Sequence, residues 1–247
     1  MTWSHFLKDN ELKIILNYFP KKSLKILEIG GGDGYQANHL SKLHHDVTSI
    51  DINPKSPKFF NVKKINNTKL EFPNETFDII FSSNVIPHIK ELNLLLNESE
   101  RVLKKNGLII HIVPSCWWSI QTNFWHYIFI PKYITKSILK RLHLSNQKKE
   151  LFITKNNLNN NDDTVEFKFK RLFFHPLGLN PSFIHELYYF SKFYWAKLFL
   201  KYNFKIVQII HGPFVASGYG VFKMKYMKIR KFLNIFFPSY YCVILTK

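Results

Sequence analysis

Short apolar runs alternate with segments of helical periodicity between Leu24 and Ser115. This alternation is typical of βαβ units, in which each strand of a parallel sheet is followed by a helix. Helices are expected from the glycine-rich turn after the first run to about Leu43, and over Ile89–Lys104. The runs predict five strands, over Leu24–Ile29, Asp46–Ile50, Asn61–Ile65, Phe77–Ser82 and Gly107–Val113.

The second half of the chain has a less regular pattern, which predicts further helices and two more strands. Asn180 and Pro181 are typical of a helix start, with Asn180 as the cap and Pro181 at the first helical position. We expect that helical region to run to about Tyr202, with a break at Ser191. The remaining segments predict a loop over Asn156–Asp163, strands over Phe204–Ile210 and Tyr240–Thr246, and a basic helix over Lys225–Phe236.

The length of 247 residues suits one elaborated domain with a sizeable core. Cys116 and Cys242 are too few for a disulfide framework and fit a reducing compartment. Residues 1–20 lack the continuous apolar core of a secretory signal, and no apolar run reaches the roughly 18 residues of a membrane span. We therefore expect a cytoplasmic protein, with peripheral contact at the inner face of the membrane left open.

The net charge of +18 is concentrated in the second half of the chain. Residues 115–247 carry 20 Lys and Arg against 5 Asp and Glu, whereas residues 1–114 carry 15 against 12. A basic half suggests an anionic partner, although abundant Lys and Asn also fit an AT-rich coding sequence. Only 4 of the 35 basic residues are Arg, which counts against nucleic-acid recognition.

A glycine-rich turn directly after the first predicted strand is the strongest candidate for a binding site. The run from Glu28 to Gly34, EIGGGDG, lets a cofactor lie against backbone where a Cβ would block its approach. The following helix directs its N-terminal N–H groups towards negative charge. Asp51 ends the second strand, where a carboxylate accepts hydrogen bonds from ribose hydroxyls. Residues 32–37 also match a relaxed dinucleotide fingerprint, so the turn alone leaves an NAD site open.

Several stretches in order separate these alternatives. The sequence resembles the class I S-adenosylmethionine (SAM)-dependent methyltransferases over about residues 24–115, in ILEIGGGDG, VTSIDINP, LEFPNETFDIIFSSNVIPHI and RVLKKNGLIIHIVPS. The resemblance implies an α/β, Rossmann-like fold: a mostly parallel seven-stranded sheet with an antiparallel C-terminal strand and an aromatic, basic insertion after strand five. It further implies a SAM-binding core over residues 1–115, an acceptor-binding cap over 116–203, and closing strands over 204–247.

The same resemblance implies a role for each matching position. Asp51 would hold the ribose, Ile52 would pack on the adenine, and Asn66 would face the adenine amino group. His88 falls where the family has a Glu-His pair, but Pro87 replaces the Glu, so we assign no metal ligands. The full set of expected cofactor-binding residues is Glu28, Gly30, Gly31, Gly32, Gly34, Asp51, Ile52, Asn66, Ser83 and Asn84.

A weaker resemblance covers the second half. His175 and Glu186, followed by Ser191, Trp195 and Phe199, are similar to the tail of methyltransferases of bacterial surface-polysaccharide biosynthesis. This implies O-methylation of a sugar hydroxyl in an anionic glycan or glycolipid precursor. The candidate catalytic residues are His88, His175 and Glu186. Each has a structural alternative: His88 as a packed or capping histidine, His175 as a loop histidine, and Glu186 as a charge on a helix surface.

Other functions and partners stay open. Because the second half is basic, an RNA methyltransferase stays an alternative function, although scarce Arg disfavours nucleic acid as a partner. A methyltransferase that acts on a small molecule or a lipid is a further alternative. The basic run Lys223–Phe237 fits either contact with an anionic membrane or a solvated face. Trp3 and His5 are candidates for an N-terminal lid over the cofactor, and the oligomeric state is not predicted.

Overall fold

The computed structural model describes residues 2–20, 22–56, 59–66, 68–125, 127–128, 176–177, 181–218 and 224–247. His175, Asn180 and the predicted loop Asn156–Asp163 lie outside the described residues.

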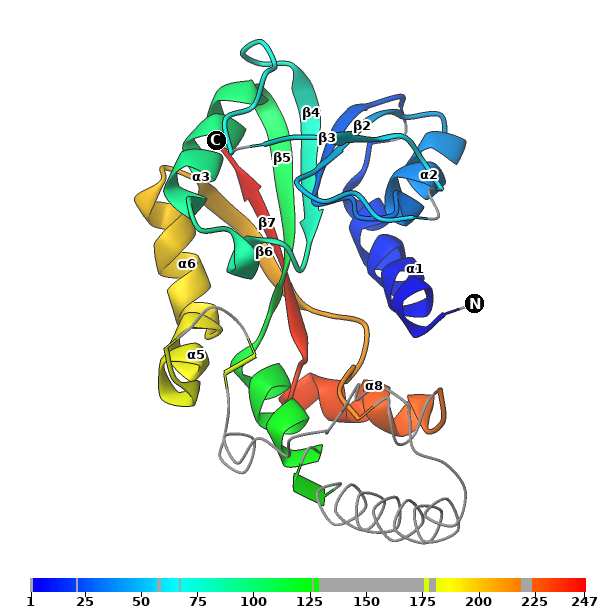
Figure 1. Cartoon of the computed structure of the whole chain (residues 1–247), viewed down its shortest axis with the longest axis vertical. Helices are drawn as coiled ribbons and strands as arrows, with labels where there is room; N and C mark the ends of the chain where they lie inside the picture. Colours follow the sequence, from blue (N-terminus) through cyan, green and yellow to red (C-terminus); the bar gives the residue numbers. More distant parts are fainter. Residues whose placement is uncertain are drawn as a thin grey trace, which may run out of the picture.

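A seven-stranded sheet forms the centre of the molecule, with strand order β3-β2-β1-β4-β5-β7-β6 (Figure 1). All neighbouring strands pair in parallel except β7, which is antiparallel to both β5 and β6. This confirms the predicted mostly parallel sheet with an antiparallel C-terminal strand. The strands are β1 (Lys25–Ile29), β2 (Asp46–Asp51), β3 (Val62–Lys64), β4 (Phe77–Ser83), β5 (Leu103–Pro114), β6 (Lys205–His211) and β7 (Tyr240–Thr246).

Helices cover both faces of the sheet (Figure 1). Helices α1 (Trp3–Ile15) and α2 (Tyr35–Lys42) lie on one side, and α3 (Leu92–Val102) and α6 (Lys192–Lys201) lie on the other. Two buried apolar clusters correspond to these two faces: Leu12 and Leu40 pack with Phe81 in one, while Leu96 and Phe199 belong to the other. Short helices η1 (Leu16–Tyr18) and η2 (Ile86–His88), together with α5 (Phe183–Tyr189) and α8 (Met227–Phe236), complete the labelled elements.

The structure differs from the sequence prediction at the start of β5. Helix α3 ends at Val102 and β5 begins at Leu103, four residues before the predicted start. Phe77 pairs with Leu103, and the register then shifts so that Ile79 pairs with Leu108. The irregular pairing hides the first residues of this strand, because a bulge interrupts the regular alternation of buried and exposed positions.

The helical region between residues 183 and 201 breaks at Ser191, where the sequence predicted a break. Ser191 caps α6 by accepting a hydrogen bond from the Tyr194 N–H. The start of α5 was predicted differently, because Ser182 is its cap and Pro181 lies before that cap rather than at the first helical position. The Ser182 side chain accepts a hydrogen bond from the His185 N–H, and so provides the N-terminal cap that was expected of Asn180.

Candidate cofactor site

The glycine-rich turn joins β1 to α2 at the edge of the sheet where the parallel strands end. Gly32 adopts φ +59°, and nothing lies within 4 Å of the position that a Cβ would occupy there. L-residues rarely adopt this backbone conformation, and the open side of Gly32 gives a ligand direct access to the main chain. Gly32 is therefore the glycine of the turn that fits the predicted cofactor approach most directly.

Asp51 lies beside this open face, at the carboxyl end of β2. Its Oδ2 accepts a hydrogen bond of 2.8 Å from the Gly32 N–H, and its Oδ1 accepts one of 2.7 Å from the Asn53 N–H. Each carboxylate oxygen can accept more than one hydrogen bond, so both retain capacity for ribose hydroxyls. The neighbouring Ile52 side chain is 65% exposed, which leaves an apolar surface next to the carboxylate.

Glu28 is buried against the inner side of the turn. Its Oε2 accepts a hydrogen bond of 2.5 Å from the Ser49 hydroxyl, and burial raises the pKa of the Glu28 carboxyl. A Cβ at Gly31 would overlap Ser49 Oγ and lie 2.7 Å from Glu28 Oε2. Gly31 thus makes room for the Glu28–Ser49 pair, and the geometry favours a supporting role for Glu28 over direct contact with a ligand.

The N-terminal helix holds the turn from one side. His5 Nε2 lies 2.9 Å from Asp33 Oδ2, and Lys8 Nζ donates to Asp33 Oδ1 at 3.1 Å. Burial alone would raise the pKa of Asp33, but the hydrogen bonds from His5 and Lys8 lower it below its usual value. The His5 ring stacks on Tyr35, the first residue of α2, at 4.1 Å between ring centroids. These contacts place His5 beside the turn, where the sequence suggested a lid.

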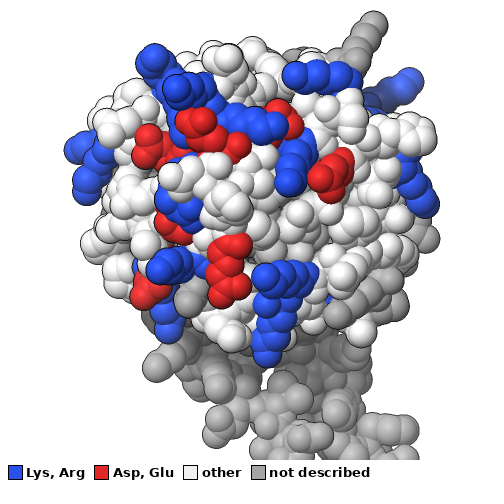
Figure 2. Space-filling model, turned by 90° about the horizontal axis from the view of Figure 1, so that it is seen from above, with Lys and Arg blue, Asp and Glu red and all other residues white. Residues whose placement is uncertain are grey.

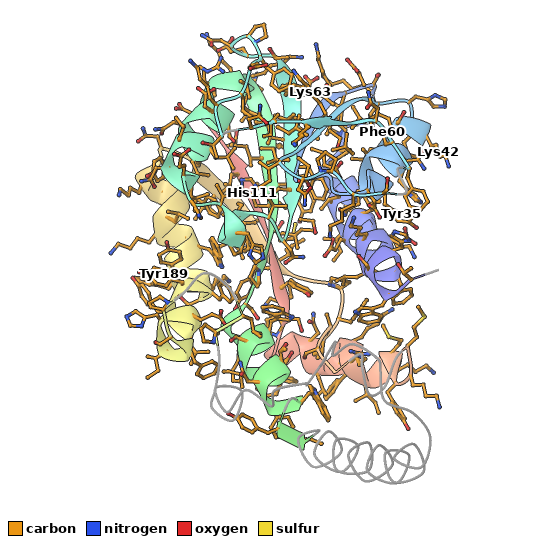
Figure 3. The ribbon with its side chains drawn as sticks, viewed as in Figure 1. Tyr35, Lys42, Phe60, Lys63, His111 and Tyr189 are labelled. Atoms are coloured by element: carbon orange, nitrogen blue, oxygen red, sulfur yellow. The ribbon has the colours of Figure 1, made fainter. Side chains whose placement is uncertain are left out.

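A segment after β2 holds the turn from the other side. The Lys55 N–H donates to Gly32 O at 2.9 Å, and the Phe59 N–H donates to Asp33 O at 2.8 Å. Phe60 follows, and its backbone N and O would lie 2.9 Å from a Cβ at Gly34. Figure 3 shows Tyr35 and Phe60 on the side of the sheet that carries α2. The turn is therefore fixed by contacts from two segments distant in sequence.

A buried carboxylate that the sequence analysis missed connects α1 to the end of β4. Glu11 is 1% exposed and accepts hydrogen bonds from Ser83 Oγ at 2.7 Å and from Gln36 Nε2 at 3.3 Å. Burial raises the pKa of Glu11 to about 7, although the hydrogen bond from Ser83 acts in the opposite direction. The signal was present in the sequence, because Glu11 precedes Leu12 and stands four residues from both Leu7 and Ile15 on one helical face.

The predicted residues at the end of β4 lie next to Glu11. The Asn84 Nδ2 group donates to Glu11 Oε1 at 3.5 Å and to Ser83 Oγ at 3.4 Å. Asn84 has φ +56°, a conformation that Asn tolerates better than most residues. The structure therefore brings Ser83 and Asn84 together with a third polar group, contributed by α1.

Asn66 lies apart from this group, after the short edge strand β3. Its side chain is exposed and lines a small hollow together with Lys63, Lys64 and Glu71. Figure 3 shows Lys63 near the outer edge of the sheet. The adenine contact expected of Asn66 stays a prediction.

Two of the three candidate catalytic residues, His88 and Glu186, lie in the described part of the chain, and their environments differ. His88 ends the short helix η2 and its side chain is exposed. Glu186 is fully buried: its Oε1 accepts from the Ser119 hydroxyl and its Oε2 accepts from the Leu177 N–H at 2.7 Å. The alternative that Glu186 is a helix-surface charge is therefore wrong, because the carboxylate ties α5 to the helix formed by residues 116–125.

His111 is a fully buried histidine of β5. Its Nδ1 lies 2.7 Å from Ser82 Oγ, and its ring stacks on Phe199 of α6. Burial lowers the pKa of His111 to about 3, so the ring is neutral at ordinary pH. Figure 3 shows His111 in the middle of the molecule, within the sheet.

The sequence is similar to that of known methyltransferases. Residues 27–111 match the family described as "Methyltransferase domain". The chain is 28% identical over 118 residues to the ubiquinone biosynthesis O-methyltransferase of Pelagibacter ubique, an alignment that covers 42% of this chain and 49% of the relative. The chain spans about half the length of the first curated relatives it matches.

Solved structures show the same fold at low sequence identity. A SAM-dependent methyltransferase from Mesorhizobium loti superposes with a TM-score of 0.54 at 9% identity, covering 96% of this chain and 98% of the other. A 1,6-didemethyltoxoflavin-N1-methyltransferase from Burkholderia thailandensis, solved with its substrate and S-adenosylhomocysteine, has a TM-score of 0.53 at 10% identity. It covers 98% of this chain and 77% of the other chain. Residues 27–111 thus match a methyltransferase domain, and the whole described chain has the fold of solved SAM-dependent methyltransferases.

Proposed function

We propose that this chain is a SAM-dependent O-methyltransferase that acts on a hydroxyl of a quinone-type small molecule. The observation that carries the SAM-dependent part of the proposal is the open backbone face of Gly32 next to the Asp51 carboxylate. The Pelagibacter relative, a ubiquinone biosynthesis O-methyltransferase, supports the O-methylation and the acceptor class.

The residues around the turn fit SAM as the bound cofactor. Asp51 would accept the ribose hydroxyls, and Ile52 would cover the adenine with its exposed side chain. Ser83 and Asn84 would lie nearest the methionine end, supported by Glu11. SAM supplies a methyl group on a positively charged sulfur, and transfer of that group is an in-line displacement in which positioning does much of the work.

His88 is the candidate base for this transfer. A hydroxyl is a weak nucleophile until its proton is removed, and histidine is the side chain most often used for that step. His88 lies a few residues beyond the end of β4 and is exposed, so an acceptor can approach its ring. Glu186 is a positioning residue in this proposal, because its carboxylate is fully buried and accepts hydrogen bonds from Ser119 and Leu177. The role of His175 stays a prediction.

The quinone-type acceptor is preferred over the sugar hydroxyl that the second half of the sequence suggested. Two residues of that resemblance, Trp195 and Phe199, are buried and explained by packing. The Trp195 indole N–H donates to Pro114 O at 3.1 Å, and Phe199 stacks on His111. Residues that serve the core in this way give no support for sugar recognition.

The acceptor class can be tested by following labelled methyl groups. The purified chain is incubated with methyl-labelled SAM in three parallel reactions. Each reaction contains one fraction of a bacterial extract: the lipid-solvent fraction, the polysaccharide fraction or the RNA fraction. We expect label in the solvent-extractable fraction, resistant to nuclease and glycosidase, and lost with the Asp51→Ala variant. Label in polysaccharide would assign the sugar acceptor instead, and label released by nuclease would assign RNA.

A further inference from the structure

Helix α8 presents apolar residues to solvent and polar residues to the protein. Arg230 and Asn234 are each 5% exposed, whereas Ile229 is 56% exposed and Phe232 and Phe236 are each 60% exposed. A surface helix of a globular protein normally shows the opposite arrangement. The exposed face of α8 is therefore built for contact with something other than water.

The buried polar residues fix this orientation. The Arg230 guanidinium donates through Nε to Val215 O at 2.8 Å and packs over the Trp3 ring at 5.1 Å. The Asn234 amide donates to Gly212 O at 2.7 Å. Because these bonds satisfy backbone carbonyls of the segment before the helix, α8 cannot rotate its apolar residues inward without losing them.

The exposed residues of α8 form a continuous surface, here called the α8 face. Phe232 and Phe236 are in ring contact at 5.8 Å, and Phe236 contacts Phe237 at 6.3 Å. The α8 face comprises Ile229, Phe232, Leu233, Ile235, Phe236 and Phe237. Contiguous exposed apolar surface of this kind marks an interaction site.

Exposed lysines border the α8 face. Lys225, Lys228 and Lys231 are exposed, and residues 224–237 contain no Asp or Glu. The end of the molecule opposite α8 differs, because there Lys and Arg are interspersed with Asp and Glu (Figure 2). Apolar and aromatic residues combined with lysines and no acidic residue are the composition of helices that lie on anionic membranes. A second copy of the chain is a poorer partner, since a two-fold contact would bring like charges together.

The α8 face lies at the same end of the sheet as the cofactor turn. Helix α8 leads into β7, whose first residue Tyr240 pairs with Pro114 at the carboxyl end of β5. The parallel strands β1, β2 and β4 end at this same edge, with Ile29, Asp51 and Ser83. A surface bound to the α8 face would thus lie near the end of the molecule where a methyl acceptor enters.

We propose that the α8 face binds the surface of an anionic lipid bilayer. None of the helices that the structure describes is long and apolar enough to cross a membrane. The bound helix would lie along the interface, with Phe232 and Phe236 among the lipid chains and the lysines at the headgroups. This proposal concerns binding alone and does not depend on the methyltransferase activity.

The test is flotation of the full chain with phosphatidylcholine vesicles, with and without phosphatidylglycerol. We expect flotation with the anionic vesicles, weaker flotation with the neutral ones, and loss on adding salt. Lys228→Gln/Lys231→Gln should weaken anionic-vesicle binding roughly thirtyfold, and Phe232→Ser/Phe236→Ser at least about tenfold. Leu200→Ser is the matched control, because Leu200 is 58% exposed on α6, which leads to the opposite end of β6.

Two results would overturn the proposal. Failure of the folded wild-type chain to float with either vesicle would do so, as would equal flotation of the wild type and the Phe232→Ser/Phe236→Ser variant. A wild-type dimer in light scattering that this variant abolishes, without any lipid binding, would assign the α8 face to a second copy of the chain. Circular dichroism of each variant confirms that it is folded.

Discussion

Three carboxylates in the first quarter of the chain have different surroundings and so different roles. Glu11 and Glu28 are buried, and their pKa values are raised by burial. Asp51 is half-buried and accepts hydrogen bonds from two backbone N–H groups of neighbouring loops. Of these three residues, Asp51 is therefore the carboxylate available to a ligand from solvent.

Replacing Asp51 should weaken SAM binding more than it weakens the fold. The Asp51→Ala variant loses charge-assisted acceptors for ribose hydroxyls, which corresponds to roughly tenfold to a hundredfold in affinity. Calorimetric titration with SAM measures the change. Asp46→Ala is the matched control, because Asp46 is an exposed residue at the other end of the same strand. Equal affinities for the two variants would remove Asp51 from the site.

Because burial raises the pKa of Glu11, we expect the stability of the fold to depend on pH. Its pKa is about 7 in the folded chain and near 4.5 when unfolded, so between these values the folded state binds more protons. The free energy of unfolding should consequently fall as pH rises from about 5 to 8, by on the order of 3 kcal/mol for this group. Urea unfolding at several pH values tests this: Glu11→Gln should flatten the fall, and an unchanged pH profile would contradict the assignment.

Two glycines of the turn between β1 and α2 should respond differently to the same substitution. Gly32→Ala places a methyl group in open space, so we expect a loss of about 1 kcal/mol from backbone strain and a larger loss of SAM affinity. Gly34→Ala drives a methyl group into the Phe60 backbone and should destabilise the fold more. Thermal melts and SAM titrations of both variants separate the effects. If Gly32→Ala and Gly34→Ala each lose SAM affinity only in proportion to their loss of thermal stability, Gly32 has only a structural role.

The strands were the elements that the sequence predicted best. Strand β7 has the predicted bounds, because its buried residues form a nearly continuous apolar run, and β2 extends only one residue further than predicted. Helix α1 was not predicted, since charged and polar residues interrupt its apolar positions and its apolar partners come from distant segments such as α2 and β4. Helical spacing places Glu11 on the face of Leu7 and Ile15, but the hydrogen-bond partners of Glu11 and Lys8 depend on tertiary packing.

At the scale of the whole molecule, the cofactor turn, η2 and the α8 face all lie towards one end of the sheet. The turn and Asp51 could be predicted because a run of glycines and a strand-terminal carboxylate leave a local signal in the sequence. The outward orientation of the α8 face depends instead on which side of the helix finds backbone acceptors, and only the folded chain shows it.

The turn between β1 and α2 is the proposed SAM site. Calorimetric titration of the full chain with SAM and, in parallel, with NAD tests it most directly, because the turn alone also matches a dinucleotide fingerprint. We predict saturable binding of one SAM per chain, competition by S-adenosylhomocysteine, and no binding of NAD. Binding of NAD in place of SAM, or no binding of SAM to the folded chain, would show that this turn is not a SAM site.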